Sequence, residues 1–235
     1  MEALSACSIS PHSRISQVDE IAIRNRLIAV FSQKGMPDKF RVDNGAPLGE
    51  PKHKIISSLA LWLIGLGIEV IWNPPRSPRD NAKVERGQRT SKNWADIYQQ
   101  SSYDELQCRL NEVCDFQRCQ FRVRRLDYQT RAQAYPGLDQ VANPYSDNSF
   151  DPNRIYSFLE KCSFARVVSK AGQIQIYGQQ YYICTKRKYQ TVHLHFQSTT
   201  KEWKVSDPQG LWLKQLPTTN FSPEKLWNLS VCQRT

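Results

Sequence analysis

The sequence lacks the marks of several common protein classes. Its seven cysteines include no Cys-x-x-Cys pair, so neither a disulfide framework nor a zinc knuckle is indicated. The four histidines are scattered. His193 and His195 would share one face of a strand, but no cysteine or acidic neighbour completes a metal site, and we interpret them as packing or solvent-facing. The first twelve residues hold neither a positively charged leader nor a long apolar stretch, so we do not expect secretion.

Long apolar runs are also scarce. Residues 55–72 form the one that approaches the length of a membrane span, with Glu69 as its single charge. Gly65 and Gly67 interrupt it, and the residues that follow are β-branched. The run therefore predicts a buried helix at about 54–66 followed by a buried strand at 68–72, and no membrane partner.

The charge is strongly positive and uneven. Lys and Arg number 32 against 22 Asp and Glu, and about seven of the ten net charges lie from Asp151 onward. A basic C-terminal third favours a polyanionic partner, and nucleic acid is the first candidate. Net charge alone leaves open a basic protein without such a partner.

Two carboxylates occupy positions suited to a divalent metal ion. A strand at 40–42 delivers Asp43 at its end, and Glu85 follows 42 positions later on a helix. Ser77 can cap that helix and Pro78 suits its first position. A carboxylate on a strand end and one on a helix can share a hard cation such as Mg²⁺.

The Glu85 helix carries a polar stripe at helical spacing. Its members are Asn81, Glu85, Arg89 and Lys92. Taken alone, the stripe is typical of a solvated helix face stabilised by a Glu–Arg pair.

The whole string is more specific than its parts. Asp43-Asn44-Gly45, then Ser77-Pro78-x-x-Asn81-x-x-x-Glu85 with Arg89 and Lys92, resembles the integrase core of retroviral integrases and insertion-sequence transposases, the DDE superfamily. The resemblance covers residues 1–125 and implies a ribonuclease H-like α/β core that transfers DNA strands with Mg²⁺ or Mn²⁺. It implies Asp43 and Glu85 as catalytic metal ligands and Asn44 and Asn81 as neighbours of the site. The DNA-facing residues would be Lys83, Arg86, Arg89 and Lys92.

The family uses three carboxylates, and this sequence supplies two. The first aspartate of the family belongs to a strand ahead of the one predicted at 3–9, and neither Glu2 nor Asp19 is placed to replace it. Asp19 belongs to the first turn of a helix that Ser16 opens and that Gly35 and Pro37 end. The resemblance therefore implies an N-terminally truncated core whose first strands are missing, with weak metal binding and no activity alone.

The C-terminal half changes pattern. A capped helix runs from Ser102 to about 122, and residues 126–153 form a helical extension and linker. Short strands follow at 164–168, 174–177, 181–184, 191–196, 203–205 and 211–213. They predict a small all-β barrel over 154–217, which resembles the SH3-like C-terminal domain of integrases, with a tail at 218–235. Lys186, Arg187 and Lys188 lie between two strands as a DNA-backbone patch or an ordinary solvated loop.

The leading interpretation is a transposase or integrase fragment in the bacterial cytoplasm whose partner is DNA, at transposon ends and target; homo-oligomer formation stays open. The alternatives are a non-catalytic DNA-binding protein derived from a transposase, and a nuclease of the same superfamily.

Overall fold

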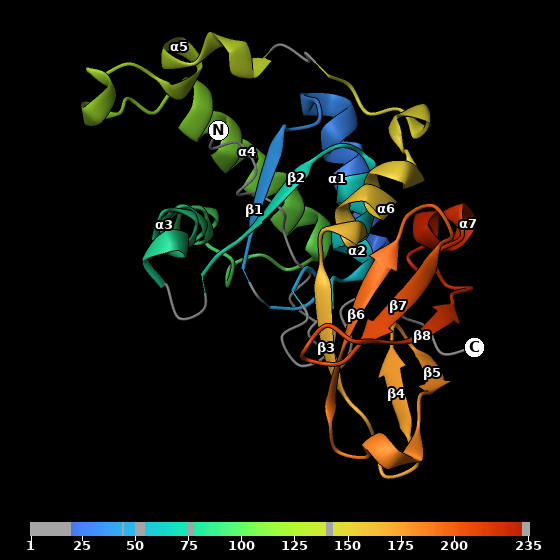
Figure 1. Cartoon of the computed structure of the whole chain (residues 1–235). Helices are drawn as coiled ribbons and strands as arrows, with labels where there is room; N and C mark the ends of the chain where they lie inside the picture. Colours follow the sequence, from blue (N-terminus) through green and yellow to red (C-terminus); the bar gives the residue numbers. More distant parts are fainter. Residues whose placement is uncertain (1–19, 44, 50–54, 75–77, 140–142, 232–235) are drawn as a thin grey trace. The chain divides into compact units, whose positions relative to one another are not determined.

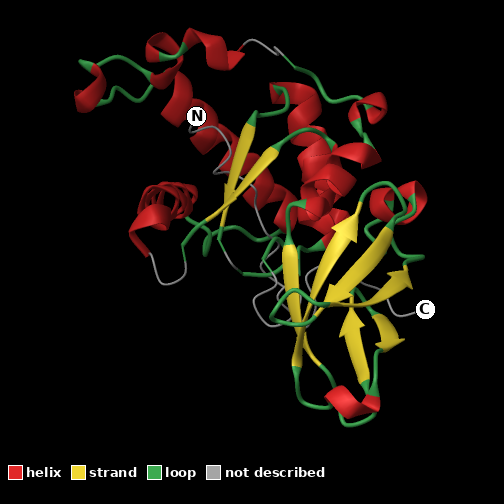
Figure 2. Cartoon of the chain, viewed as in Figure 1, coloured by secondary structure: helices red, strands yellow, loops and turns green. Residues whose placement is uncertain are grey.

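The structure is a computed structural model that describes residues 20–43, 45–49, 55–74, 78–139 and 143–231 (Figure 1). The described residues form a mixed α/β fold with helices, one parallel strand pair and two antiparallel sheets (Figure 2). They group into two compact units. The helical unit comprises Arg26–Met36 and Pro74–Pro144, and the mixed unit comprises Val18–Asn25, Pro37–Asn73 and Tyr145–Thr235.

Helix α1 (Glu20–Lys34) ends where the sequence predicts a stop. Gly35 follows it with φ of +83°, a left-handed conformation that glycine adopts without a Cβ clash, and its N–H donates to the Phe31 carbonyl at 2.9 Å. The side chains of Leu27 and Phe31, on one face of the helix, are buried. The helix start predicted at Ser16 and the strand predicted at 3–9 lie outside the described residues.

Helix α2 (Ser58–Gly65) lies at the core of the mixed unit. All eight of its residues are buried, and the Ser57 hydroxyl caps it by accepting from the Ala60 N–H at 3.2 Å. Strands β1 (Lys39–Val42) and β2 (Glu69–Trp72) pair in parallel, with Val42 opposite Trp72. The buried helix predicted from the apolar run is confirmed, and so is the strand. The prediction that the strand is buried was wrong for every residue of β2 except Val70, because β2 has β1 as its single described strand partner and its other side chains are half-buried or exposed. No helix in the described part of the chain combines the length and the apolar character needed to cross a bilayer.

Residues after 144 complete the surroundings of α2. Helices α6 (Pro152–Glu160) and α7 (Pro223–Trp227) pack against it. The Gly65 carbonyl accepts from the Asp151 N–H at 2.9 Å and from Arg154 Nη1 at 3.1 Å. A Cβ at Gly65 would lie 2.4 Å from the Phe150 ring, so this close approach requires glycine. The sequence segments 37–73 and 145–231 therefore share one core.

Besides the second part of α1, the helical unit is built around two packed helices. Helix α3 (Pro78–Ala95) packs against α4 (Tyr103–Cys119), and Ser91, Ala95 and Val113 are buried there. The predicted cap Ser102 accepts from the Glu105 N–H at 3.1 Å. The remaining elements are η1 (Arg124–Leu126), α5 (Arg131–Ala134) and η2 (Pro136–Asp139).

Six strands follow α6, and each overlaps one predicted from the sequence. Among the described residues, β3, β6, β7 and β8 form an open antiparallel sheet in that order, β4 and β5 form a separate hairpin, and the strands do not close into a barrel. Tyr177 and Gly178, both with positive φ, form the two-residue turn of that hairpin. The bounds are η3 (Asp147–Ser149), β3 (Ser163–Val167), β4 (Gln173–Ile176), β5 (Gln179–Tyr182), η4 (Thr185–Arg187), β6 (Thr191–Gln197), β7 (Glu202–Ser206) and β8 (Trp212–Pro217).

An aromatic cluster holds this half of the mixed unit together. The rings of Tyr177 and Trp203 stack with centroids 6.1 Å apart, and Phe221 meets both edge-on. The Tyr177 hydroxyl accepts from the Ile56 N–H at 3.2 Å, which ties the hairpin to the segment before α2. The buried Asn220 side chain donates to the carbonyls of Tyr177 and Val231, so the predicted tail at 218–235 begins as a packed segment that includes α7.

Candidate functional site

Asp43 lies at the carboxyl end of β1, beside the end of its parallel partner β2. Its side chain is exposed, and its Oδ1 accepts a hydrogen bond from the Gly45 N–H at 3.0 Å. The Asn73 N–H donates to the Val42 carbonyl at 2.9 Å and extends the parallel pairing past β2. Carboxyl ends of parallel strands are the usual ligand side of open α/β sheets. The turn therefore fixes one oxygen of a carboxylate that stays accessible to water on that side.

Glu85 lies on α3 within the helical unit, and its side chain is exposed. Arg89 and Lys92, one and two turns later, are exposed as well, and so is Arg86. Within the described residues, Glu85 and Arg89 form no ion pair with each other, so the stabilising pair of the alternative interpretation is not seen here. Helix α3 thus presents an open carboxylate among three accessible cations.

For three predicted site residues, either the whole residue or its side chain lies outside the described part of the structure. Asn44 is outside the described residues altogether. Asn81 and Lys83 belong to α3, but their side chains lie outside the described part. Their placement next to the carboxylates stays a prediction.

The carboxylates Asp43 and Glu85 belong to different compact units, and their proximity also stays a prediction. Among the residues that the structure describes, no three His, Cys, Asp or Glu side chains gather in a way that could hold a metal ion. Carboxylate oxygens are the hard donors that Mg²⁺ and Mn²⁺ prefer, so the chemistry of the two side chains fits such an ion, which two protein ligands alone would hold weakly.

The predicted basic patch divides into two kinds of residue. Lys186 and Lys188 are exposed on either side of Arg187, at the end of η4. Arg187 instead turns toward Asp207, with Nη1 3.6 Å from Oδ2, and the two side chains are 30% and 9% exposed. Asp207 Oδ1 also accepts from the N–H groups of Gln209 and Leu211 at 3.1 and 2.9 Å. Arg187 therefore supports a neighbouring turn, and the lysines are the residues open to a ligand.

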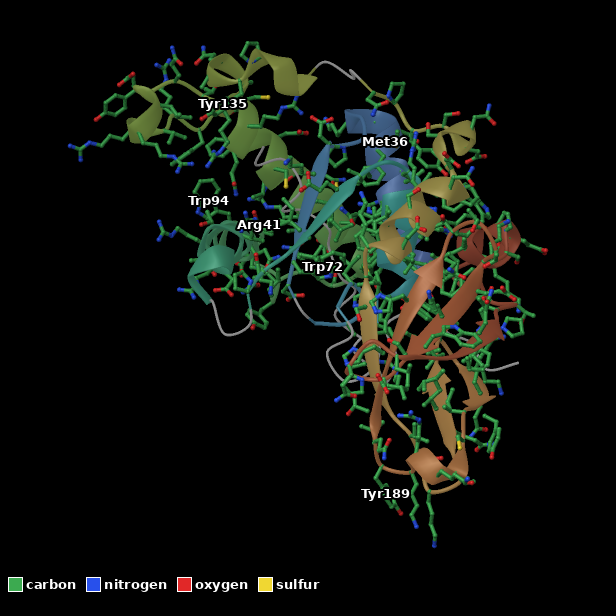
Figure 3. All side chains as sticks on the ribbon, in the orientation of Figure 1. Met36, Arg41, Trp72, Trp94, Tyr135 and Tyr189 are labelled. Atoms are coloured by element: carbon green, nitrogen blue, oxygen red, sulfur yellow. The ribbon has the colours of Figure 1, made fainter. Side chains whose placement is uncertain are left out.

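Gly172 packs closely against the backbone at the start of this loop. Gly172 accepts from the Ile183 N–H at 2.8 Å, and its φ of +77° is a left-handed conformation. A Cβ there would lie 2.7 Å from the backbone nitrogen of Thr185, where η4 begins. The Tyr189 ring, just beyond the lysines, is exposed at the outer end of the unit (Figure 3).

Sequence reasoning missed further cations of the mixed unit. Lys214 Nζ donates to the Tyr182 carbonyl at 3.0 Å and lies 5.6 Å from the centre of its ring. Trp212, two residues earlier on β8, is an exposed aromatic side chain. Burial lowers the pKa of the Arg166 guanidinium, whose Nε donates to the Gln175 carbonyl at 3.0 Å, so Arg166 is a structural residue. Side chains alternate between the two faces of a strand, so the sequence alone could have predicted that Trp212 and Lys214 lie on the same face of β8.

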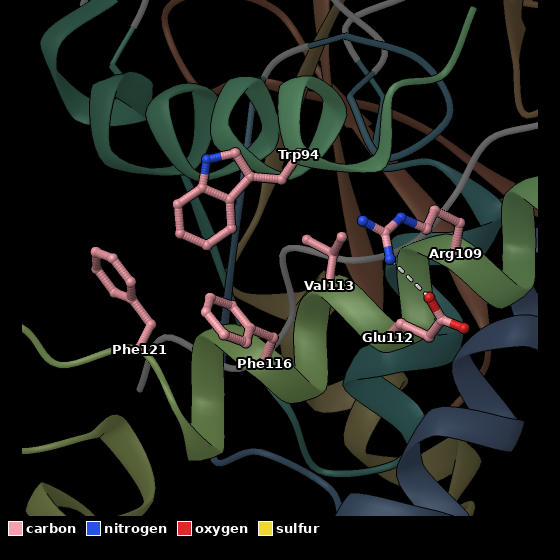
Figure 4. A pocket seen from close by; sticks show the side chains of 6 residues that line it. All are labelled: Trp94, Arg109, Glu112, Val113, Phe116 and Phe121. Carbon is pink, nitrogen blue, oxygen red and sulfur yellow. Dashed lines mark hydrogen bonds and ion pairs between the residues drawn. The ribbon is translucent and has the colours of Figure 1, made fainter. Parts of the chain in front are cut away.

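The helical unit holds a groove that the sequence pattern did not indicate. Its walls are α3 and α4, and its lining residues are Trp94, Arg109, Glu112, Val113, Phe116 and Phe121 (Figure 4). Glu112 accepts from Arg109 Nη1 at 2.8 Å at one end, and the three aromatic rings gather at the other.

A comparison with known protein families gave no match: no family model matches this chain.

Proposed function

We propose that this chain is a transposase- or integrase-related protein of the DDE superfamily that binds DNA through its basic surfaces. The observation that carries the proposal is the string from Asp43 to Glu85 together with Arg89 and Lys92. It is supported by the position of Asp43 at the carboxyl end of a parallel strand pair and by the exposed carboxylate and cations of α3. In this proposal residues 1–125 correspond to a ribonuclease H-like core and residues 154–217 to an SH3-like DNA-binding domain whose strands stay open and share a core with residues 37–73.

Asp43 and Glu85 are the residues that would hold Mg²⁺ or Mn²⁺. Such an ion would supply stabilisation of the negative charge that develops in a phosphoryl transfer. Arg86, Arg89 and Lys92 would hold the DNA backbone beside the carboxylates by neutralising phosphates. With two of the superfamily's three carboxylates identified, the chain binds DNA and does not transfer strands by itself.

Binding to duplex DNA tests the proposal. Fluorescence anisotropy of a labelled duplex should show an affinity that falls as salt rises and that differs little between duplex sequences, because counterion release drives the binding. An affinity independent of salt between low and physiological concentrations would refute the proposal.

A specific observation supports the second candidate, a non-catalytic DNA-binding protein derived from a transposase. Asp43 already accepts a hydrogen bond from Gly45, as an ordinary turn residue does. Titration with Mn²⁺, followed by electron paramagnetic resonance, separates the two candidates. Weak Mn²⁺ binding that Asp43→Asn and Glu85→Gln each remove favours the superfamily site, and equal binding by all three proteins favours the non-catalytic candidate.

A further inference from the structure

The groove between α3 and α4 is formed by the way helix α4 ends. The Phe121 N–H donates to the Phe116 carbonyl at 2.8 Å, which turns the chain back and brings the second ring beside the first. The Trp94 ring from α3 meets both edge-on, with centroids 5.9 Å from Phe116 and 5.1 Å from Phe121. Figure 4 shows the three rings together at one end of the groove.

The groove is not filled by the packing of its own unit. Phe116 is 43% exposed and Phe121 is 38% exposed, although they belong to one aromatic cluster. The cavity measures about 630 Å³, within the roughly 300–1,000 Å³ of small-ligand sites. Partly exposed aromatic rings beside an open cavity of this size make the groove a candidate ligand site.

The groove itself holds one charged pair, Arg109 with Glu112, and the chain that leaves it after Phe121 is rich in arginine. The segment 116–131 contains five arginines and a single acidic residue. Arg122 follows Phe121 directly and Arg124 begins η1, and both are exposed. Arg89 and Lys92 are exposed on α3, the helix that carries Trp94. A ligand that lies on the exposed rings and follows the chain out of the groove would therefore need a flat apolar part for the rings and negative charge for the arginines.

We propose that the groove binds unpaired bases of a single-stranded nucleic acid, with Phe116 and Phe121 stacking on the bases and Arg122 and Arg124 holding the phosphates. Aromatic side chains next to backbone-neutralising cations are the general means of binding single strands. This inference rests on the proposed role in DNA binding and adds a substrate form, an unpaired strand, to it. A second copy of the chain is a poorer occupant because it would bring the same dense positive charge to the contact.

The experiment compares a labelled single-stranded oligonucleotide with a duplex of equal length, using the full chain and fluorescence anisotropy. Phe121→Leu keeps an apolar side chain and removes the ring, and Phe121→Tyr keeps the ring. Tyr98→Ala is the matched control, since Tyr98 belongs to the same unit, is 92% exposed and does not line the groove.

Phe121→Leu should weaken single-strand binding by roughly 5- to 150-fold, the range for one stacked base, without changing the salt slope. Phe121→Tyr and Tyr98→Ala should bind as the wild type does, and duplex affinity should hold in all three variants. Arg122→Ala should flatten the single-strand salt slope by about 0.7. Equal melting temperatures of Phe121→Leu and Phe121→Tyr establish that a difference between them comes from binding.

Three results would overturn the inference. Equal single-strand affinity of Phe121→Leu and the wild type would show that the ring does not stack. Loss of self-association in Phe121→Leu during sedimentation, with single-strand binding intact, would identify the groove as a contact between copies. Wild-type protein that binds neither form of DNA would end both this inference and the proposed function, whereas duplex binding without any effect of the ring would end the inference alone.

Discussion

Substitution should affect Lys186 and Lys188 differently from Arg187, the residue between them at the end of η4. Lys186 and Lys188 are exposed, whereas Arg187 is directed at the nearly buried Asp207. We expect the double change Lys186→Ala and Lys188→Ala to weaken DNA binding without affecting folding. Arg187→Ala should destabilise the protein, because it leaves Asp207 without its cation.

The magnitudes follow from the structure. Each lost phosphate contact lowers the slope of log affinity against log salt by about 0.9, so two contacts lower it by about 1.8. Between 50 and 200 mM salt, the wild type would then lose about twelve times more affinity than the double variant loses. The Arg187–Asp207 pair is intermediate between exposed pairs, worth about 0–1 kcal/mol, and buried pairs, whose breakage costs about 3–5 kcal/mol, so we expect Arg187→Ala to cost about 1–3 kcal/mol.

Two measurements check this reasoning. Anisotropy across the salt series gives the slopes, and urea unfolding gives the free energies. Lys161→Ala is the matched control, because Lys161 is an exposed lysine of the same unit. It follows the last residue of α6, Glu160, which accepts a hydrogen bond at 2.9 Å from Ser198, and Ser198 directly follows β6 at the end that is far from η4. An unchanged slope in the double lysine variant would return the loop to ordinary solvated surface and leave α3 as the main candidate for contact with DNA.

Three further predictions concern other parts of the chain. With Mg²⁺ or Mn²⁺ the chain should show neither strand transfer nor nicking of DNA ends, because two of three carboxylates are identified; metal-dependent nicking that Asp43→Asn abolishes would contradict this. Asn220→Ala should lower the free energy of unfolding by about 1–3 kcal/mol, because it leaves the buried carbonyls of Tyr177 and Val231 without their donor; a chemical melt that matches the wild type would refute it. Hydrogen bonds from the hydroxyl and N–H of Ser101 hold the pKa of Glu105 below its usual range. The ionised carboxylate therefore stabilises the folded state at neutral pH, and this contribution is lost as the pH falls through the lowered pKa. Ser101→Ala should raise the pKa of Glu105, as the carboxyl shifts in a nuclear magnetic resonance titration would show.

Local signals in the sequence predicted much of the fold. The apolar run interrupted by Gly65 and Gly67 gave α2 and β2, and short alternating segments gave all six C-terminal strands. Helix α6 carried the usual start signal, Asp151 as cap with Pro152 at the first position, yet this segment was interpreted as the end of a linker and the start of a barrel. Closure of the strands into a barrel depends on long-range pairing, which local alternation does not determine.

The candidate site was less predictable because its features depend on tertiary contacts. Arg187 forms an ion pair with Asp207, which lies twenty positions later in the sequence. The sequence pattern gives no sign that these two residues meet. The groove combines Trp94 with two rings more than twenty positions later, and only the packing of α3 on α4 brings them together. Spacing along one helix did place Glu85, Arg89 and Lys92 on an exposed stripe, since that relation is local.

The shared core of segments 37–73 and 145–231 has a consequence for synthesis on the ribosome. Helix α2 emerges early, but the helices that cover it, α6 and α7, are translated more than 80 residues later. At roughly 5–20 residues per second, α2, whose residues are all buried in the folded protein, waits several seconds for its partners while the helical unit is being made. During that interval the nascent chain exposes one of its most hydrophobic helices, so its yield in a cell should depend on chaperones that shield apolar segments.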